Sequence, residues 1–197
     1  PDEVIDEQAI VCSDVFPTGW YGARLAEVGR GDTVAVFGAG PVGQLAIASA
    51  WKLGAGRVLA VDQVHDRLEL ARGQHAEPVD FSAEDPVEAL RDLTNGVGPD
   101  RVIDAVGVDA YPPPSGEASE EEQREASQGG ELTWRHGTRP SQAARWAVDA
   151  VAKAGTIGVI GVYPPGFDAF PIGSAMNRNL TVHLGNCPHR SVIPPLL

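Results

Sequence analysis

Three glycines and one carboxylate are the residues of this chain whose spacing most clearly indicates chemistry. Gly38, Gly40 and Gly43 form the pattern GAGPVG directly after the apolar run Thr33–Phe37, and Asp62 follows. The first glycine allows a tight turn, the second lets the backbone approach a pyrophosphate, and the third lets a helix pack closely on a strand. Asp62 lies at about the 20-residue spacing expected of an acid that binds ribose hydroxyls. The pattern therefore predicts a dinucleotide-binding turn.

A helix expected directly after this turn supplies the anion-binding part of the site. Pro41 falls where the first turn of a helix tolerates proline, and the helix from Val42 to Leu53 stops at Gly54. Its first N–H groups and positive dipole end attract phosphate without a charged side chain. Pro41 and Val42 are therefore counted as cofactor-binding residues. The alternative is a purely structural glycine turn with a solvated Asp62.

The rest of the chain alternates short apolar runs with helical patterns. Further strands are expected at 57–61, 78–81, 100–106, 155–162 and 179–184. This alternation predicts an α/β fold, a doubly wound parallel (Rossmann) sheet of six strands in the order 3-2-1-4-5-6. A cofactor would lie across the switch point between the first and fourth strands. Gly107 and Val162, which end the fourth and fifth strands, are assigned to cofactor binding as well.

Three amphipathic helices are expected between the later strands. One covers Val64–Arg72 and turns Leu68 and Leu70 inward, and another starts at Pro86 with Asp85 as its cap. The third covers 140–152. Its inward face is expected to carry Ala143, Trp146, Ala147 and Ala150.

Composition excludes several classes of partner. A net charge of −12 and a pI near 4.7 argue against nucleic acids and anionic membranes, which leaves small molecules or proteins. No apolar run reaches the roughly 18 residues of a membrane span, and no secretory signal is visible, so we expect a cytoplasmic protein. Cys12 and Cys187 lie far apart, so neither a disulfide framework nor a cysteine-rich zinc site is expected.

The chain divides into a helical lead-in, 1–31, and a nucleotide-binding domain, 32–197. A second helix of the lead-in is expected to start near Thr18, after the interruption at Pro17. An acid-rich insertion, 108–139, is expected to be exposed. Because the chain begins at Pro1 without an initiator methionine, we expect it to be a fragment or an excised domain.

The stretch CSDVFPTGWYGA, one short helix before GAGPVG, resembles the zinc-dependent medium-chain alcohol dehydrogenases. The likeness is closer to the formaldehyde dehydrogenase branch, which shows an SD-x-x-PTG pattern and a long insertion after the fourth strand. The resemblance implies that Asp14 is the third ligand of a catalytic zinc and that Thr18 lines the nicotinamide. It also assigns the glycine turn to the pyrophosphate, Asp62 to the adenosine ribose and Arg67 to the same ribose.

The resemblance also implies what this chain does not carry. The other two zinc ligands, the proton relay and the four-cysteine lobe belong to a separate catalytic domain, so the zinc site here is expected to be incomplete. For Asp14 the residues alone favour a helix-cap or turn aspartate. Cys12 is expected to be a buried apolar residue. The histidines show no metal-binding spacing, and each is expected to be a surface or structural residue: His65, His75, His136, His183 and His189.

Two functions follow from these readings. The first is the coenzyme domain of an NAD- and zinc-dependent oxidoreductase that transfers hydride between NAD and an alcohol or aldehyde, with the chain alone inactive. The second is a non-catalytic NAD-binding module or a shortened gene product. NAD is expected rather than NADP, because Asp62 would repel the additional phosphate. The edge strand 179–184 is expected to mediate homo-oligomer formation.

Overall fold

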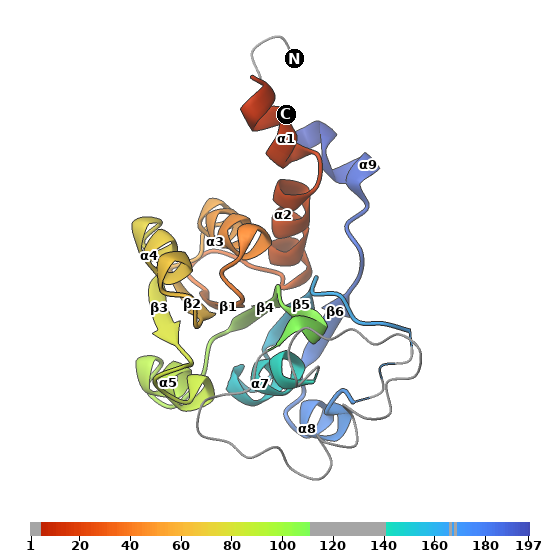
Figure 1. Ribbon diagram of the computed structural model, residues 1–197. Helices are drawn as coiled ribbons and strands as arrows, with labels where there is room; N and C mark the ends of the chain where they lie inside the picture. Colours follow the sequence, from red (N-terminus) through yellow and green to blue (C-terminus); the bar gives the residue numbers. More distant parts are fainter. Residues whose placement is uncertain (1–4, 111–140, 166, 168) are drawn as a thin grey trace.

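The computed structural model describes residues 5–110, 141–165, 167 and 169–197. In this part of the chain a six-stranded sheet is covered by helices on both faces (Figure 1). Its order is β3-β2-β1-β4-β5-β6 and every neighbouring pair is parallel, as predicted. The strands are β1 (Thr33–Phe37), β2 (Arg57–Asp62), β3 (Glu77–Asp80), β4 (Arg101–Asp104), β5 (Thr156–Val159) and β6 (Thr181–Leu184).

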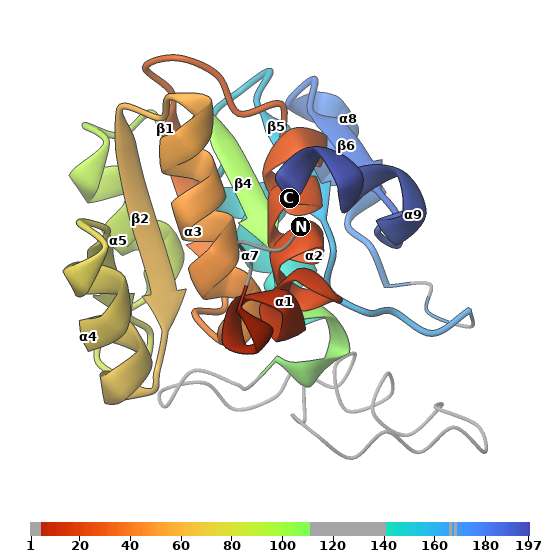
Figure 2. The same ribbon diagram turned by 90° about the horizontal axis from the view of Figure 1, so that it is seen from above.

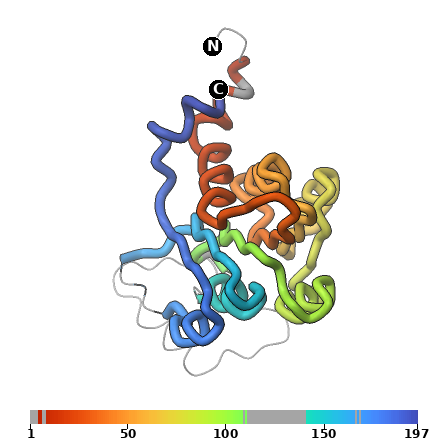
Figure 3. Tube along the Cα trace, turned by 180° about the vertical axis from the view of Figure 1, so that it is seen from behind, coloured from red at the N-terminus to blue at the C-terminus, as the bar shows by residue number. Residues whose placement is uncertain are grey.

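The helices form two layers (Figures 1 and 2). One layer contains α2 (Val15–Leu25), α3 (Pro41–Leu53) and α4 (His65–Gly73); the other contains α5 (Pro86–Leu93), α7 (Gln142–Ala150) and α8 (Ile172–Asn177). Shorter elements are α1 (Asp6–Cys12), η1 (Gly107–Asp109), α9 (His189–Val192) and η2 (Pro194–Leu196). The chain after β6 runs back toward α2, where α9 lies (Figure 3).

Each face of the sheet has its own apolar core, which is why the strands read as continuous apolar runs. On the α5 and α7 face, Trp146 packs against Phe37 and Phe81, with ring centroids 6.3 and 5.2 Å apart. The predicted inward face of α7 is confirmed, because all four of its named residues are buried. The cap of α5 is also confirmed: the Asp85 carboxylate accepts hydrogen bonds from the amides of Val87 and Glu88.

Three expectations about local structure were wrong. Helix α2 begins at Val15, because Pro17 occupies its first turn, where a missing N–H costs no intrahelical bond. In α4, Leu68 is 5% exposed but Leu70 is 59% exposed, since residues two apart point to different sides of a helix. The insertion also starts buried: Val108 and Ala110 are covered, and its remaining residues, 111–139, lie outside the described part.

Helix α2 approaches its neighbours closely at two glycines, at Gly19 against the backbone of α3 and at Gly22 against a side chain. A Cβ on Gly19 would lie 2.7 Å from the Ala46 nitrogen in α3, and one on Gly22 would lie 2.5 Å from the Ile160 side chain. Glycine is required at Gly19, where the neighbouring atoms are backbone, whereas at Gly22 the Ile160 side chain would have to move. The lead-in helix is therefore packed directly onto α3 and the end of β5.

Strand β6 forms one edge of the sheet, as predicted, and the Leu184 side chain is 67% exposed there. Its role in self-association stays a prediction. Within the described ranges, no helix combines the length and apolar character needed to cross a membrane.

Candidate functional site

The three glycines of the turn have three different environments. Gly38 has a φ of +84°, which favours glycine, and a Cβ on Gly43 would lie 1.8 Å from the Gly38 carbonyl oxygen. At Gly40 a Cβ would meet only the Arg67 guanidinium, 4.0 Å away. The first glycine therefore makes the turn and the third allows helix α3 to pack on it. The second leaves a backbone surface open to a ligand.

Helix α3 begins next to this open surface without a side-chain cap. Its N-cap is Gly40, Pro41 is the first helical residue, and no side chain caps the helix. The first N–H groups of a helix have no intrahelical acceptor, so they are available to an anion. An uncapped helix start beside an open glycine has the geometry that a pyrophosphate requires.

Asp62 stands at the carboxyl end of β2, beside the turn, and is only 5% exposed. Its Oδ2 accepts a hydrogen bond from the Ala39 amide at 2.8 Å, and its Oδ1 accepts from the amides of Gln63 and Val64 at 2.8 and 3.0 Å. The carboxylate is therefore fixed in position by backbone. It also ties β2 to the glycine turn, which brings together the residues that the sequence singled out.

Arg67 from α4 completes this group. Its Nη1 lies 3.5 Å from Asp62 Oδ2, and its side chain is half-exposed. The guanidinium therefore lies close both to the Asp62 carboxylate and to the open face of Gly40.

A cavity of about 270 Å³ opens beside these residues. Asp62, Arg67, Gly38 and Gly40 line it on one side, and the aromatic rings of Phe81 and Trp146 line it on another. Sequence analysis placed Trp146 in the core only and gave Phe81 no role. No signal in the sequence separates a core aromatic from one that also borders a cavity.

Gln44 is a further residue that sequence analysis missed. Its buried side-chain amide donates to the backbone oxygens of Ala39 and Arg67, each at 2.9 Å. It thereby links the glycine turn to α4. A polar residue on the inward face of an otherwise apolar helix was the signal that could have found it.

Gly107 and Val162, both predicted to bind cofactor, contact each other in the structure. Gly107 has a φ of +68°, and a Cβ there would lie 2.4 Å from the backbone nitrogen and oxygen of Val162. The close approach expected at Gly107 is therefore made to the chain itself. Direct cofactor contact by either residue stays a prediction.

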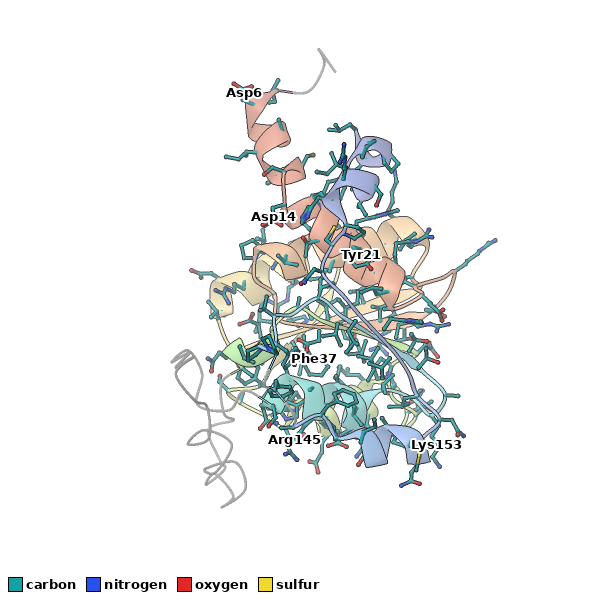
Figure 4. All side chains as sticks on the ribbon, turned by 90° about the vertical axis from the view of Figure 1, so that its right-hand side faces the viewer. Asp6, Asp14, Tyr21, Phe37, Arg145 and Lys153 are labelled. Carbon is teal, nitrogen blue, oxygen red and sulfur yellow. The ribbon has the colours of Figure 1, made fainter. Side chains whose placement is uncertain are left out.

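A second polar cluster lies at the start of α2, next to α9 (Figure 4). Asp14 occupies the N-cap position of α2, yet its side chain makes no cap bond. Its Oδ1 instead accepts from the Thr18 hydroxyl at 3.2 Å and lies 2.9 Å from His189 Nε2. The cap role that the residues alone favoured is thus not what the side chain does.

His189, expected to be a surface or structural histidine, is partly exposed and contacts Asp14, which agrees with that expectation. His189 reaches Asp14 from the far end of the chain, so sequence spacing could not reveal the pair. Cys187 lies in the same cluster. Burial raises the pKa of its thiol, a hydrogen bond with Thr18 lowers that pKa, and the charge of Asp14 raises it. Among the described residues no group of three metal-ligating side chains occurs.

The cluster around Asp14 lies near the glycine turn, because α2 packs on α3. A Cβ on Gly19, the neighbour of Thr18, would lie 2.9 Å from the Val42 carbonyl oxygen in the first turn of α3. Thr18 therefore stands next to the predicted pyrophosphate turn. The arrangement places a carboxylate and an imidazole beside one end of a dinucleotide-type site.

Fold and turn together define a Rossmann-like α/β domain. Comparison with known proteins extends this assignment. Residues 41–114 match a family profile described as zinc-binding dehydrogenase. An uncharacterized zinc-type alcohol dehydrogenase-like protein, AdhB, of Bacillus subtilis is 40% identical over 93% of this chain and 46% of its own length. Zinc-type alcohol dehydrogenase B of Aspergillus flavus is 32% identical over 100% of this chain and 40% of its own length.

Solved structures agree. The alcohol dehydrogenase TADH from Thermus sp. ATN1 superposes with a TM-score of 0.75 at 30% identity, over 100% of this chain and 47% of that one. The chain is thus similar, in sequence and in fold, to zinc-type medium-chain alcohol dehydrogenases. It spans about half the length of the curated relatives it matches.

Proposed function

We propose that this chain binds NAD for an oxidoreductase that transfers hydride between NAD and an alcohol or aldehyde. The observation that carries the proposal is the buried Asp62 carboxylate at the cavity, held by the same turn whose Gly40 face is open. The adenosine ribose would bind Asp62 and the pyrophosphate would bind the start of α3. The nicotinamide would then lie toward Thr18.

Asp14 is proposed to supply one ligand of the catalytic zinc. The carboxylate oxygens and the nearby imidazole of His189 are donor types that zinc accepts, so the pair fits part of a zinc site. If zinc were bound there, it would supply Lewis-acid polarisation of a substrate oxygen. Thr18 and His189 both contact Oδ1 of Asp14, and these contacts orient the carboxylate. The remaining ligands would come from outside the chain, so the chain alone is expected to be inactive.

The formaldehyde dehydrogenase-type branch is the proposed place of the chain within the family. It rests on the aspartate in SDVFPTG and on the acid-rich insertion after β4. The substrate would be a small alcohol or aldehyde, and most of its pocket would be built by residues outside this chain.

The substitution Gly40→Val tests the cofactor assignment. Gly40 has extended backbone, and its Cβ direction is open apart from Arg67, so the fold accepts valine there. The branched side chain would occupy the surface that a pyrophosphate needs. We expect normal thermal unfolding but NAD+ affinity at least roughly 100-fold weaker by calorimetric titration, because close backbone approach is lost.

Gly73→Val provides the matched control. Gly73 ends α4, and a Cβ there would meet no atom within 4 Å. This variant is expected to bind NAD+ like the unsubstituted chain. Undiminished NAD+ binding by Gly40→Val, or none by the unsubstituted chain, would overturn the proposal.

A further inference from the structure

The carboxylate of Asp104 is wholly buried at the carboxyl end of β4, and the proposed function gives it no task. Its Oδ1 accepts hydrogen bonds from the amides of Val106 and Gly107 at 2.9 and 3.0 Å. Its Oδ2 accepts a hydrogen bond from the Tyr163 hydroxyl at 2.7 Å. A buried carboxylate is costly unless its oxygens are hydrogen-bonded, and here donors from two separate segments bond it.

Tyr163 reaches Asp104 from the segment that follows β5. Its ring packs on Phe167, with centroids 4.7 Å apart, and against the apolar core below the sheet. Burial raises the pKa of the phenol far above its usual range, the charge and hydrogen bond of Asp104 raise it further, and the Ala144 backbone opposes them. The hydroxyl therefore remains a hydrogen-bond donor at any physiological pH.

Backbone contacts join the same two segments. The amides of Ile160 and Gly161 donate to the Asp104 carbonyl oxygen at 3.0 and 2.9 Å, and the Val108 amide donates to the Val162 carbonyl oxygen at 3.0 Å. Gly107 lies against Val162 with no room for a Cβ. Segments 105–108 and 160–163 are thus fastened to each other beyond the ends of their strands. The Asp104–Tyr163 bond is the side-chain link between them.

These segments lie where the second half of a dinucleotide would pass. Asp62 and the turn fix the adenosine and pyrophosphate on the β2 side of β1, and β4 and β5 lie on the opposite side. A dinucleotide crosses this switch point, so its other half meets the ends of β4 and β5. The Val162 side chain, 71% exposed, stands at that end. This step rests on the proposed function.

We propose that Asp104 and Tyr163 are positioning residues for the nicotinamide half of the cofactor. They act by holding segments 105–108 and 160–163 in one arrangement before the cofactor binds. Preorganised contacts of this kind improve affinity because less order has to be gained on binding.

Calorimetric titration of this chain with NAD+ and with ADP-ribose, which lacks the nicotinamide, separates the two halves. Tyr163→Phe removes only the hydroxyl and leaves the ring in the core. We expect NAD+ binding about ten-fold weaker and ADP-ribose binding changed by less than about two-fold, because the adenosine side keeps its contacts.

Thr94→Val is the matched control. The Thr94 hydroxyl donates to the Leu90 carbonyl oxygen and accepts from the Gly98 amide, at the opposite end of the sheet. Its loss is expected to lower stability while leaving the ratio of NAD+ to ADP-ribose affinity unchanged. A merely structural role of Tyr163 would give the same unchanged ratio.

Asp104→Asn keeps one acceptor oxygen, and we expect it to weaken the binding of NAD+ more than the binding of ADP-ribose as well. If this variant does not fold, Tyr163→Phe decides the question. If Tyr163→Phe loses affinity equally for NAD+ and ADP-ribose, or loses none, the positioning role is overturned. NAD+ binding by the unsubstituted chain would still uphold the proposed function in that case. Failure of the unsubstituted chain to bind either ligand would overturn both.

Discussion

Removing the charge of Asp62 is expected to abolish discrimination between NAD and NADP. A 2′-phosphate bound at the ribose position would bring a negative charge to about 4 Å from the carboxylate, where two unit charges interact by about 4 kcal/mol at an effective dielectric constant near 20. Arg67, 3.5 Å from Asp62, attracts the same phosphate and is half-exposed, so we take about half of this repulsion as the net effect. About 2 kcal/mol corresponds to about a 30-fold preference for NAD.

Asp62→Asn keeps the shape of the side chain and an acceptor for the Gln63 and Val64 amides but removes the charge. The ratio of the two affinities should then approach one. NAD itself should bind about ten-fold more weakly, because hydrogen bonds from the ribose to a charged acceptor are lost. Arg67→Gln should shift the ratio the opposite way, further toward NAD.

The assay is calorimetric titration of NAD+ and NADP+ at one fixed ionic strength, since exposed charges are screened by salt. Each ratio is measured on one protein, so a general loss of stability cancels from it. Tight NADP+ binding by the unsubstituted chain, equal to that of NAD+, would refute the reasoning. So would a ratio that Asp62→Asn leaves unchanged.

Three further outcomes are expected. Asp14→Ala, introduced into a polypeptide that also carries the other zinc ligands, should reduce zinc content by metal analysis while NAD+ affinity stays within about two-fold, because the carboxylate is separate from the turn. Gly43→Ala should lower the free energy of unfolding by about 3 kcal/mol or more in denaturant titrations, since its Cβ would collide with the Gly38 carbonyl; full stability would contradict the packing. The hydrogen bond from Arg57 lowers the pKa of Glu77 below 4.5, so the pair's stabilisation is present above that pH and is lost as pH falls through the folded-state pKa. In Glu77→Gln the free energy of unfolding should therefore fall less steeply as the pH is lowered. An unchanged pH dependence would show that the ion pair does not contribute.

Local signals predicted most of the fold. The strand order followed from the alternation of apolar runs with helical patterns, and the cap at Asp85 and the stop at Gly54 followed from side-chain and backbone preferences of single residues. The orientation of Leu70 was predicted wrongly, because residues two apart, such as Leu68 and Leu70, point to different sides of a helix. The start of α2 failed because Pro17 was read as a break rather than as a first-turn residue.

The site was predictable where its residues follow each other in one βαβ unit. The turn, Asp62 and Arg67 come together because consecutive strands and helices place them at one edge of the sheet. His189 and Tyr163 were missed because they reach their partners across 175 and 59 residues of chain. No spacing rule connects such residues; only the packed fold brings them together.

The glycine contacts of α2 determine how movement can spread through the domain. With backbone lying on backbone at Gly19, no side chain can change rotamer to absorb a displacement between α2 and α3. We therefore expect a displacement of α3 at this contact to be passed on to α2, and so to Asp14 at the N-cap of α2. A hinge within this domain is accordingly expected outside the contact between α2 and α3.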